Sequence, residues 1–302
     1  MGVDDSLMTT FSLLGTGLLG AAIGHRLLER GFTLNVWNRN STRCGSLVEA
    51  GAQQVKHPTE SLDRASVVLT VLRDGPVTAE VVKSLGPLDG RTVVPMGTMG
   101  ISESVDLADQ VQLQGGAYLE APVLGSRPEA LKGALLVMAG GEQNVFDAQL
   151  SWLGELASQP RLMGPVGTGA AAKLALNQLI ASLTHGYSLA LRLVEASGLE
   201  IERFMEVLRP SALYAPTVDK KLERMLLHQY GDPNFSTSLL RKDLRLFLRE
   251  AQLAGVNASA LQGLATLLES AEGTDLDSGD YCALHELTAA VSYTHLTLPT
   301  IE

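Results

Sequence analysis

The sequence predicts an α/β protein in which a doubly wound, mostly parallel sheet is followed by an all-helical second domain, with one long helix joining the two. Three observations predict this fold. Short β-type runs alternate with helical stretches from residue 11 to 165, a glycine-rich turn follows the first run, and the pattern after Gly169 is helical almost throughout. Alternation of this kind is typical of a parallel sheet whose two faces are both covered by helices.

The first domain is built from six apolar runs that we expect to be strands. In chain order they are FSLL, TLNVW, SVVLTVL, TVVPM, AYLEAPV and ALLVMAG. Segments with helical periodicity separate them, among them AAIGHRLLERG and SESVDLADQVQLQGG. We place this domain at residues 1–166.

The second domain, residues 167–291, begins with a long helix over about 169–196 that Ser197-Gly198 closes. Four later segments also have helical periodicity: IERFMEVLRP, DKKLERMLLHQY, LLRKDLRLFLREAQLAG and ASALQGLATLLESAEG. The last eleven residues, 292–302, read SYTHLTLPTIE and resemble translated sequencing-adapter sequence. We therefore expect them to be a non-native tail.

Composition excludes several classes of protein. Of the 302 residues, 45% are hydrophobic and 19% charged, which is typical of a globular domain with an aliphatic core. The net charge of -10, with scattered Lys and Arg, argues against nucleic-acid or membrane partners. Two cysteines without metal-ligand spacing and an acidic N-terminus unlike a secretory signal favour a cytoplasmic protein without a metal site.

The glycine-rich turn after the first strand is a GxGxxG motif, formed by Gly15, Thr16, Gly17, Leu18, Leu19 and Gly20. Gly15 permits the tight turn, Gly17 lets the backbone approach a pyrophosphate, and Gly20 lets the following helix pack on the strand. The phosphates would lie at the N-terminus of that helix. A Rossmann-type dinucleotide site is therefore expected.

The end of the second strand indicates which dinucleotide is bound. About twenty residues after the glycine loop, where NAD enzymes carry Asp or Glu, this chain has Asn38-Arg39. Arg39 can face a 2′-phosphate with its planar donor groups, and Arg43 adds a second positive charge. The sequence therefore favours NADP (NADPH) over NAD, although a solvated surface arginine stays an alternative interpretation of Arg39.

A lysine in an apolar helix is the main candidate for chemistry. In GTGAAAKLALNQ, Lys173 and Asn177 are four positions apart, so both lie on one face of a helix. Alanine and leucine surround the lysine and offer no counter-charge, which should lower its pKa towards neutrality and let it exchange a proton. The alternative is a lysine whose stem covers apolar surface while its ammonium stays in water.

The order of these motifs resembles the β-hydroxyacid dehydrogenases, the group of 3-hydroxyisobutyrate dehydrogenase and the glyoxylate/succinic semialdehyde reductases. The resemblance covers about residues 11–290. Beyond the motifs already given, it is carried by MGTMG, LEAPVLGSRPEALKGALLVMAGG and RKDLRL. It implies an NADP-dependent oxidoreductase that acts on a small molecule as a homodimer or homotetramer.

The resemblance also implies roles for individual residues. Lys173 would be the general acid/base and Asn177 would orient the substrate. Thr98 would lie near nicotinamide and substrate, Leu72 would line the nicotinamide side, and Lys242 would approach the cofactor. Gly125 and Ser126 would offer donors to a substrate carboxylate.

Two departures from the family pattern leave the substrate open. Leu124 stands where the family usually has serine, and Gly97 replaces the serine of the family's MST-type loop. A missing donor weakens carboxylate binding, so reduction of a C=N bond, as in imine reductases, is an alternative to reduction of an aldehyde or keto acid. Imine reductases generally lack the lysine at position 173. A non-catalytic NADP-binding protein is a third hypothesis.

Overall fold

The structure is a computed structural model that describes residues 9–289, and these form two compact units. The sheet unit comprises residues 9–178 and 243–257, and the helical unit comprises 179–242 and 258–289. The predicted tail, 292–302, lies outside the described residues.

The sheet unit takes in two segments that the sequence prediction placed in the second domain. They are the first three turns of α7 (Thr168–Ala196) and the part of α10 (Thr237–Leu253) from Asp243 onward. The chain passes between the units inside these two helices, and a helix carries no composition change at such a point. Lys173, Asn177 and Asp243 therefore belong to the same unit as the glycine loop.

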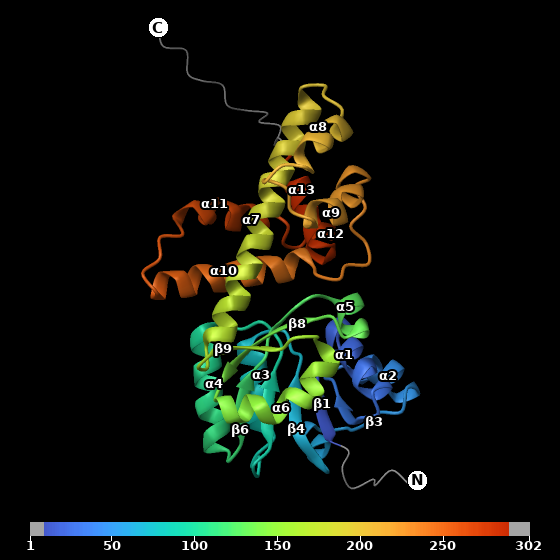
Figure 1. Ribbon diagram of the computed structural model, residues 1–302, viewed down its shortest axis with the longest axis vertical. Coiled ribbons are helices and arrows are strands. Elements are labelled where there is room, and N and C mark those ends of the chain that lie inside the picture. Colours follow the sequence, from blue (N-terminus) through green and yellow to red (C-terminus); the bar gives the residue numbers. More distant parts are fainter. Residues whose placement is uncertain (1–8, 290–302) are drawn as a thin grey trace. The chain divides into compact units, whose positions relative to one another are not determined.

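The sheet has the order β3-β2-β1-β4-β5-β6-β8-β7, and β9 pairs with β8 (Figure 1). Neighbours from β3 to β6 are parallel, whereas β8 is antiparallel to β6 and β7. The strands are β1 (Thr10–Leu14), β2 (Thr33–Trp37), β3 (Gln53–Gln54), β4 (Ala65–Thr70), β5 (Thr92–Pro95), β6 (Ala117–Glu120), β7 (Val123–Leu124), β8 (Leu136–Gly141) and β9 (Arg161–Gly164).

This strand order confirms the Rossmann-type fold and locates its binding edge. After β1 the chain continues to β2 on one side, and later returns to β4 on the other side of β1. In doubly wound sheets such a reversal leaves a crevice at the carboxyl ends of the strands, where ligands bind. The glycine loop begins directly after β1, at this edge.

Helices cover both faces of the sheet, as a parallel sheet requires (Figure 1). One core contains the side chains of Phe11, Ile23, Leu47 and Trp152. The Phe11 and Trp152 rings pack edge to face, with their ring centroids 5.3 Å apart. The other core contains Leu14, Val82 and Leu107. The helices of this unit are α1 (Leu18–Glu29), α2 (Gly45–Glu49), α3 (Gly75–Ser84), α4 (Ile101–Leu113), α5 (Arg127–Lys132) and α6 (Gln143–Leu156), with the first turns of α7 and the part of α10 from Asp243 onward.

The helical unit packs the remainder of α7 and α10 with shorter helices around a separate core. Leu191 on α7, Met205, Leu222 and Met225 are among the buried side chains of this core. Its other helices are α8 (Ile201–Leu208), α9 (Thr217–Leu226), α11 (Gln262–Glu269), α12 (Asp275–Ser278) and α13 (Leu284–Leu287).

The structure differs from the predicted elements in a few places, each for a local reason. AYLEAPV is divided into β6 and β7 at Ala121-Pro122, because proline has no N–H to donate to a neighbouring strand. The very short β3 and the four-residue β9, with sequence RLMG, were not predicted as strands, since neither has a run of β-branched or aromatic residues. Within residues 9–289, every helix is too short or too polar to cross a membrane.

Candidate active site

The glycine loop has the geometry that a dinucleotide-binding turn requires. Gly15 adopts φ +102°, and a Cβ atom there would overlap the carbonyl oxygen of Val71. A Cβ at Gly20 would overlap the carbonyl oxygen of Gly15, so the first turn of α1 packs directly on the loop. Gly17, in contrast, has no atom within 4 Å of its Cβ position and caps α1 without a side-chain bond. This open approach to a helix N-terminus fits a bound pyrophosphate.

The other loop residues hold the turn in place. Thr16 is buried and its backbone N–H donates to Asn38 Oδ1 at 3.1 Å. Leu19 packs against the core on the α1 face, while Leu18 is 50% exposed. The loop therefore leaves one apolar side chain beside the open approach at Gly17.

The predicted 2′-phosphate segment is exposed at the end of β2. Asn38 accepts from the glycine loop and donates through Nδ2 to the carbonyl of Asn40 at 2.9 Å. Its side chain thereby ties this segment to the loop. Arg39 and Arg43 are both exposed, with their guanidinium groups accessible to an anionic ligand. Within the sequence 38–44 no carboxylate is present to repel a phosphate.

The loops that follow β1, β4 and β5 lie against one another. A Cβ at Gly15 would come within 2.9 Å of Leu72 Cδ2, and a Cβ at Gly97 within 2.6 Å of the Leu72 carbonyl oxygen. The structure thus brings Leu72, the glycine loop and the loop of Thr98 together at one sheet edge. It also explains Gly97, because a serine at this position would press on the Leu72 backbone.

The catalytic candidates lie on the first turns of α7. Lys173 is half-buried, and Asn177 is 2% exposed. Asn177 Nδ2 donates to Asp243 Oδ2 of α10 at 2.5 Å, whereas Asn177 Oδ1 has no hydrogen-bond partner among the described residues. Because the carboxylate can only accept from the amide nitrogen, it fixes which way the amide points. The buried amide oxygen is then free to accept from a ligand.

The start of α7 is attached to the same sheet edge. Glu120, the last residue of β6, accepts hydrogen bonds from the backbone N–H groups of Gly167 and Gly169 at 2.8 and 2.7 Å. A Cβ at Gly167 would lie 3.0 Å from Cγ2 of Ile101, the residue that begins α4 after the Thr98 loop. Lys173 and Thr98 are therefore carried by neighbouring segments.

The predicted substrate segment, residues 124–126, lies close to the start of α7, because both contact β8. Leu124 is half-buried and pairs with Leu136 of β8, while the start of α7 reaches Met138 of the same strand at Gly169. Gly125 has φ +126°, a conformation that favours glycine. Both the N–H and the hydroxyl of Ser126 donate to Glu129 at 2.8 Å, in the first turn of α5.

Lys242 lies on α10 directly before Asp243, and it is half-buried. It belongs to the helical unit, whereas Asp243 belongs to the sheet unit. Its approach to the cofactor stays a prediction.

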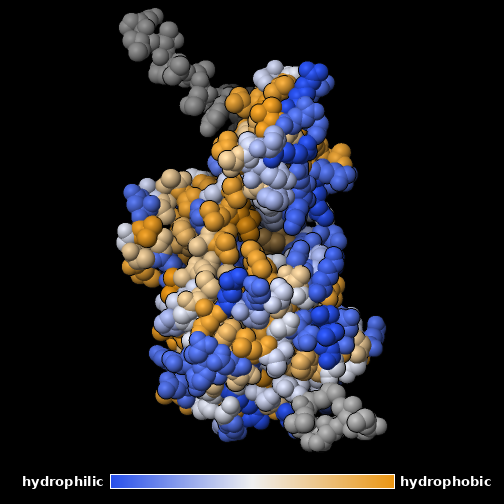
Figure 2. Space-filling view, in the orientation of Figure 1, coloured by the Kyte–Doolittle hydropathy of each residue, from blue (hydrophilic) through white to orange (hydrophobic). Residues whose placement is uncertain are grey.

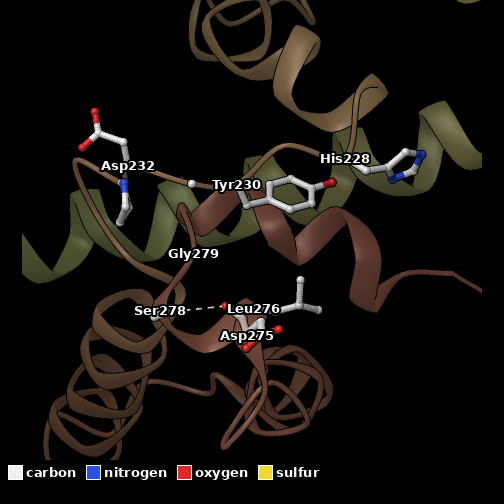
Figure 3. A pocket seen from close by; sticks show the side chains of 9 residues that line it. His228, Tyr230, Asp232, Asp275, Leu276, Ser278 and Gly279 are labelled. Atoms are coloured by element: carbon white, nitrogen blue, oxygen red, sulfur yellow. Dashed lines mark hydrogen bonds between the residues drawn. The ribbon is translucent and has the colours of Figure 1, made fainter.

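A surface hollow of about 440 Å³ lies in the helical unit (Figure 3). His228, Tyr230, Asp232 and Asp275 are among its lining residues. His228 Nδ1 is hydrogen-bonded to Glu286 Oε1 at 2.6 Å, and the Tyr230 hydroxyl donates a hydrogen bond to the same oxygen at 2.5 Å. None of the predicted site residues lines this hollow.

Two carboxylates of the site were missed by the sequence prediction. Asp243 lies within the RKDLRL motif but only its neighbour Lys242 was assigned a role. Glu120 is the single charged residue in the apolar strand AYLEAPV, which is the same signal that singled out Lys173. An isolated charge in a buried strand requires a partner, so this signal was available in the sequence.

Two protein-family models match this chain. The family model described as the NAD binding domain of 6-phosphogluconate dehydrogenase matches residues 10–164. The model described as NAD-binding of NADP-dependent 3-hydroxyisobutyrate dehydrogenase matches residues 167–288. Between them, the two models cover both predicted domains.

Individual relatives match over nearly the full chain. Glyoxylate/succinic semialdehyde reductase 1 of Arabidopsis thaliana is 28% identical over 278 residues, which cover 90% of this chain and 96% of that protein. The structure of a Mycobacterium tuberculosis 3-hydroxyisobutyrate dehydrogenase with L-serine superposes with a TM-score of 0.84, at 23% identity, and covers 94% of this chain and 100% of the other. An imine reductase from a Pseudomonas species shares the fold with a TM-score of 0.61, at 21% identity, over 93% of this chain and 99% of its own.

Proposed function

Because the chain belongs to the β-hydroxyacid dehydrogenase family, a family of NAD(P)-dependent oxidoreductases, we propose that it is an NADPH-dependent reductase of a small aldehyde or keto acid. In the reverse direction it would oxidise a β-hydroxy acid. NADPH, when bound, supplies the hydride from C4 of its nicotinamide ring. Lys173 supplies the proton.

The observation that carries this proposal is the pair on α7. Asn177 is buried and held by Asp243, while Lys173 lies one helical turn before it on the same face. Asn177 Oδ1 is a buried acceptor with no partner in the described part of the chain. Leaving such an atom unsatisfied costs free energy, so the pair is better explained as half of a ligand site than as a packing feature.

The protein residues then divide the chemistry between them. During reduction, the protonated amine of Lys173 donates its proton to the substrate oxygen as that oxygen gains negative charge. The neutral amine afterwards recovers a proton from solvent. In the oxidative direction it accepts the hydroxyl proton. Asn177 Oδ1 accepts a hydrogen bond from a substrate hydroxyl or from an ammonium group. This hydrogen bond orients the donor and the acceptor of the proton transfer.

The cofactor would be held along the edge described above. The backbone of the glycine loop and the N-terminus of α1 suit the pyrophosphate, since Gly17 leaves the approach open. Arg39 and Arg43 suit the 2′-phosphate of NADP, because both are exposed and no carboxylate competes. Leu72 and Thr98 would line the nicotinamide end of this arrangement, and Lys242 is assigned to the cofactor by family resemblance.

The substrate segment favours a ligand that does not depend on serine hydroxyls. Leu124 has no donor, and both polar hydrogens of Ser126 are directed at Glu129. The lack of side-chain donors directed at a substrate carboxylate also favours the second candidate, reduction of a C=N bond. Lys173 argues against that candidate, because imine reductases generally lack a lysine at the corresponding position.

The assignment can be tested by measuring how fast the purified chain oxidises NADPH and NADH. The substrates are glyoxylate, succinic semialdehyde and a cyclic imine. The wild-type protein should oxidise NADPH faster than NADH with one of the carbonyl substrates. Lys173→Ala should lower kcat by about 10²- to 10⁴-fold while NADPH affinity, from fluorescence titration, stays nearly unchanged.

The matched control is Lys83→Ala, which removes an exposed lysine of α3. It should keep wild-type activity. An active Lys173→Ala variant would refute the catalytic role of Lys173. Faster turnover with NADH than with NADPH would refute the role of Arg39. Turnover of the imine alone would favour the second candidate.

The assembled form that we propose is a homodimer or homotetramer. The helical unit exposes a leucine face on α7, formed by Leu179, Leu183, Leu189 and Leu193. Figure 2 shows hydrophobic side chains gathered along this helix. Exposed leucines at two i,i+4 spacings on one helix are typical of a surface buried by a partner, and a second copy of the chain is the partner that family resemblance suggests.

A further inference from the structure

Glu120 is a buried carboxyl group to which the proposed chemistry assigns no task. It ends β6 and is 1% exposed. Its burial raises the pKa of the carboxyl group, although the hydrogen bonds that it accepts oppose this effect. A buried carboxyl group of this kind costs free energy unless its contacts compensate, so the contacts are informative.

One carboxyl oxygen caps the helix that carries Lys173 and Asn177. Glu120 Oε1 accepts from the backbone N–H groups of Gly167, Gly169 and Ala170 at 2.8, 2.7 and 3.3 Å. These amides belong to the start of α7, where N–H groups have no partner within the helix. The cap therefore comes from a strand 47 to 50 residues earlier in the chain rather than from a neighbouring side chain.

The surrounding backbone makes room for this carboxyl group. A Cβ at Gly140 would overlap Glu120 Oε1, and one at Gly169 would lie 3.1 Å from the same oxygen. Glycines on β8 and on α7 thus form a close-fitting cradle around one oxygen atom. Such a cradle fixes the position of the first turn of α7 more tightly than a solvent-exposed cap could.

The second carboxyl oxygen links the helix to the loop of Thr98. Ser104 of α4 donates to Glu120 Oε2, and the Ser104 hydroxyl is also within 2.7 Å of the Tyr118 hydroxyl. Ser104 is fully buried in the first turn of α4, directly after the Thr98 loop. Glu120 therefore joins the starts of α4 and α7 through a single side chain.

We propose that Glu120 is a positioning residue that holds the first turn of α7, and with it Lys173, in register with the Thr98 loop. The inference rests on the proposed function, since it concerns the residue that donates the proton. Lys173 lies one turn beyond Ala170, so a frayed or rotated first turn moves its amine. A displacement of about 1 Å of a reacting group can cost about 10²-fold in rate.

The experiment compares three variants of the full-length chain in the NADPH assay. Glu120→Ala removes the cap, whereas Glu120→Gln keeps an amide oxygen that accepts from the same three N–H groups. Gln149→Ala is the control. Gln149 is another buried acceptor of the sheet unit, and it accepts a hydrogen bond from the Trp152 indole N–H at 2.8 Å. It lies on α6, away from α7. Thermal unfolding of each variant gives its loss of stability.

We expect Glu120→Ala to lower kcat about 10- to 100-fold with little change in the KM for NADPH, and Glu120→Gln to restore kcat to within about 3-fold of wild type. Gln149→Ala should lose stability but keep kcat. Hydrogen exchange measured by mass spectrometry should accelerate in peptides covering 165–178 in Glu120→Ala and stay protected in Glu120→Gln.

Three outcomes would overturn the proposal: a Glu120→Ala variant with wild-type kcat, a Gln149→Ala variant whose kcat falls as far, or a Glu120→Gln variant as slow as Glu120→Ala. These are distinct from failure of the proposed function. That failure would appear as an inactive wild-type protein or an active Lys173→Ala variant, whereas the exchange measurement still reports on the cap in an inactive chain.

Discussion

At the scale of the residue, Asn177 is oriented by a carboxylate that lies 66 positions further along the chain. Asp243 is 1% exposed and accepts from Asn177 Nδ2 at 2.5 Å. An amide can present either its oxygen or its nitrogen to a ligand, and the carboxylate decides between them by accepting only from nitrogen. The chemistry available at Asn177 is therefore set by Asp243.

We predict that Asp243→Ala impairs catalysis through Asn177. The variant removes the acceptor of a buried donor, which should lower the free energy of unfolding by about 1–3 kcal/mol. It should also lower kcat/KM for the carbonyl substrate, because the amide can then rotate. Steady-state kinetics and chemical denaturation measure both effects. Full kcat/KM in a destabilised variant would contradict the orienting role of Asp243.

At the scale of the element, each glycine of the loop after β1 serves a different contact. Gly15 and Gly20 are required for the packing of α1 on the loop, whereas Gly17 faces open space at the N-terminus of α1. The motif therefore combines residues required for folding with one available for binding. A matched pair of alanine substitutions can separate the two.

Gly20→Ala should destabilise the sheet unit, because its Cβ would overlap the Gly15 carbonyl oxygen. Gly17→Ala should leave the melting temperature within a few degrees of wild type but weaken NADPH binding about tenfold, since its methyl group would occupy the approach of the pyrophosphate. Calorimetric unfolding and NADPH titration measure the two effects. If Gly17→Ala binds NADPH like the wild type, the phosphate site lies elsewhere.

At the scale of the whole molecule, the net charge of -10 and the leucine face on α7 act in opposite directions on assembly. Net charge disfavours non-specific association, while exposed leucines favour a specific one. A defined oligomer is the expected result. The leucine face lies entirely within the helical unit.

In light scattering coupled to gel filtration, the wild-type protein should have two or four times the chain mass of 32.1 kDa. Leu193→Glu replaces a leucine that is 73% exposed and should dissociate the oligomer, because the charge would be buried at the interface. Val207→Glu, at a 71% exposed position on α8, is the control and should leave the mass unchanged. A monomeric wild-type protein would contradict the prediction.

The sequence by itself determined the features that local pattern encodes. Alternating apolar runs predicted the doubly wound sheet, the GxGxxG motif predicted the turn after β1, and the i,i+4 spacing placed Lys173 and Asn177 on one helix face. These succeed because strand, turn and helix geometry depend on residues within a few positions of one another. The roles assigned to Lys173 and Asn177 stay predictions for the kinetic tests.

Only the tertiary structure decided which distant side chains act on that local framework. The hydrogen bonds of Glu120 to α7 and of Asp243 to Asn177 join residues 47 to 66 positions apart, and the division into units runs through the middle of two continuous helices. No periodicity or propensity spans such separations, because these contacts form only when the sheet and the helices have packed. The sequence thus predicted which residues carry the chemistry, and the packed structure decided which distant side chains hold those residues in place.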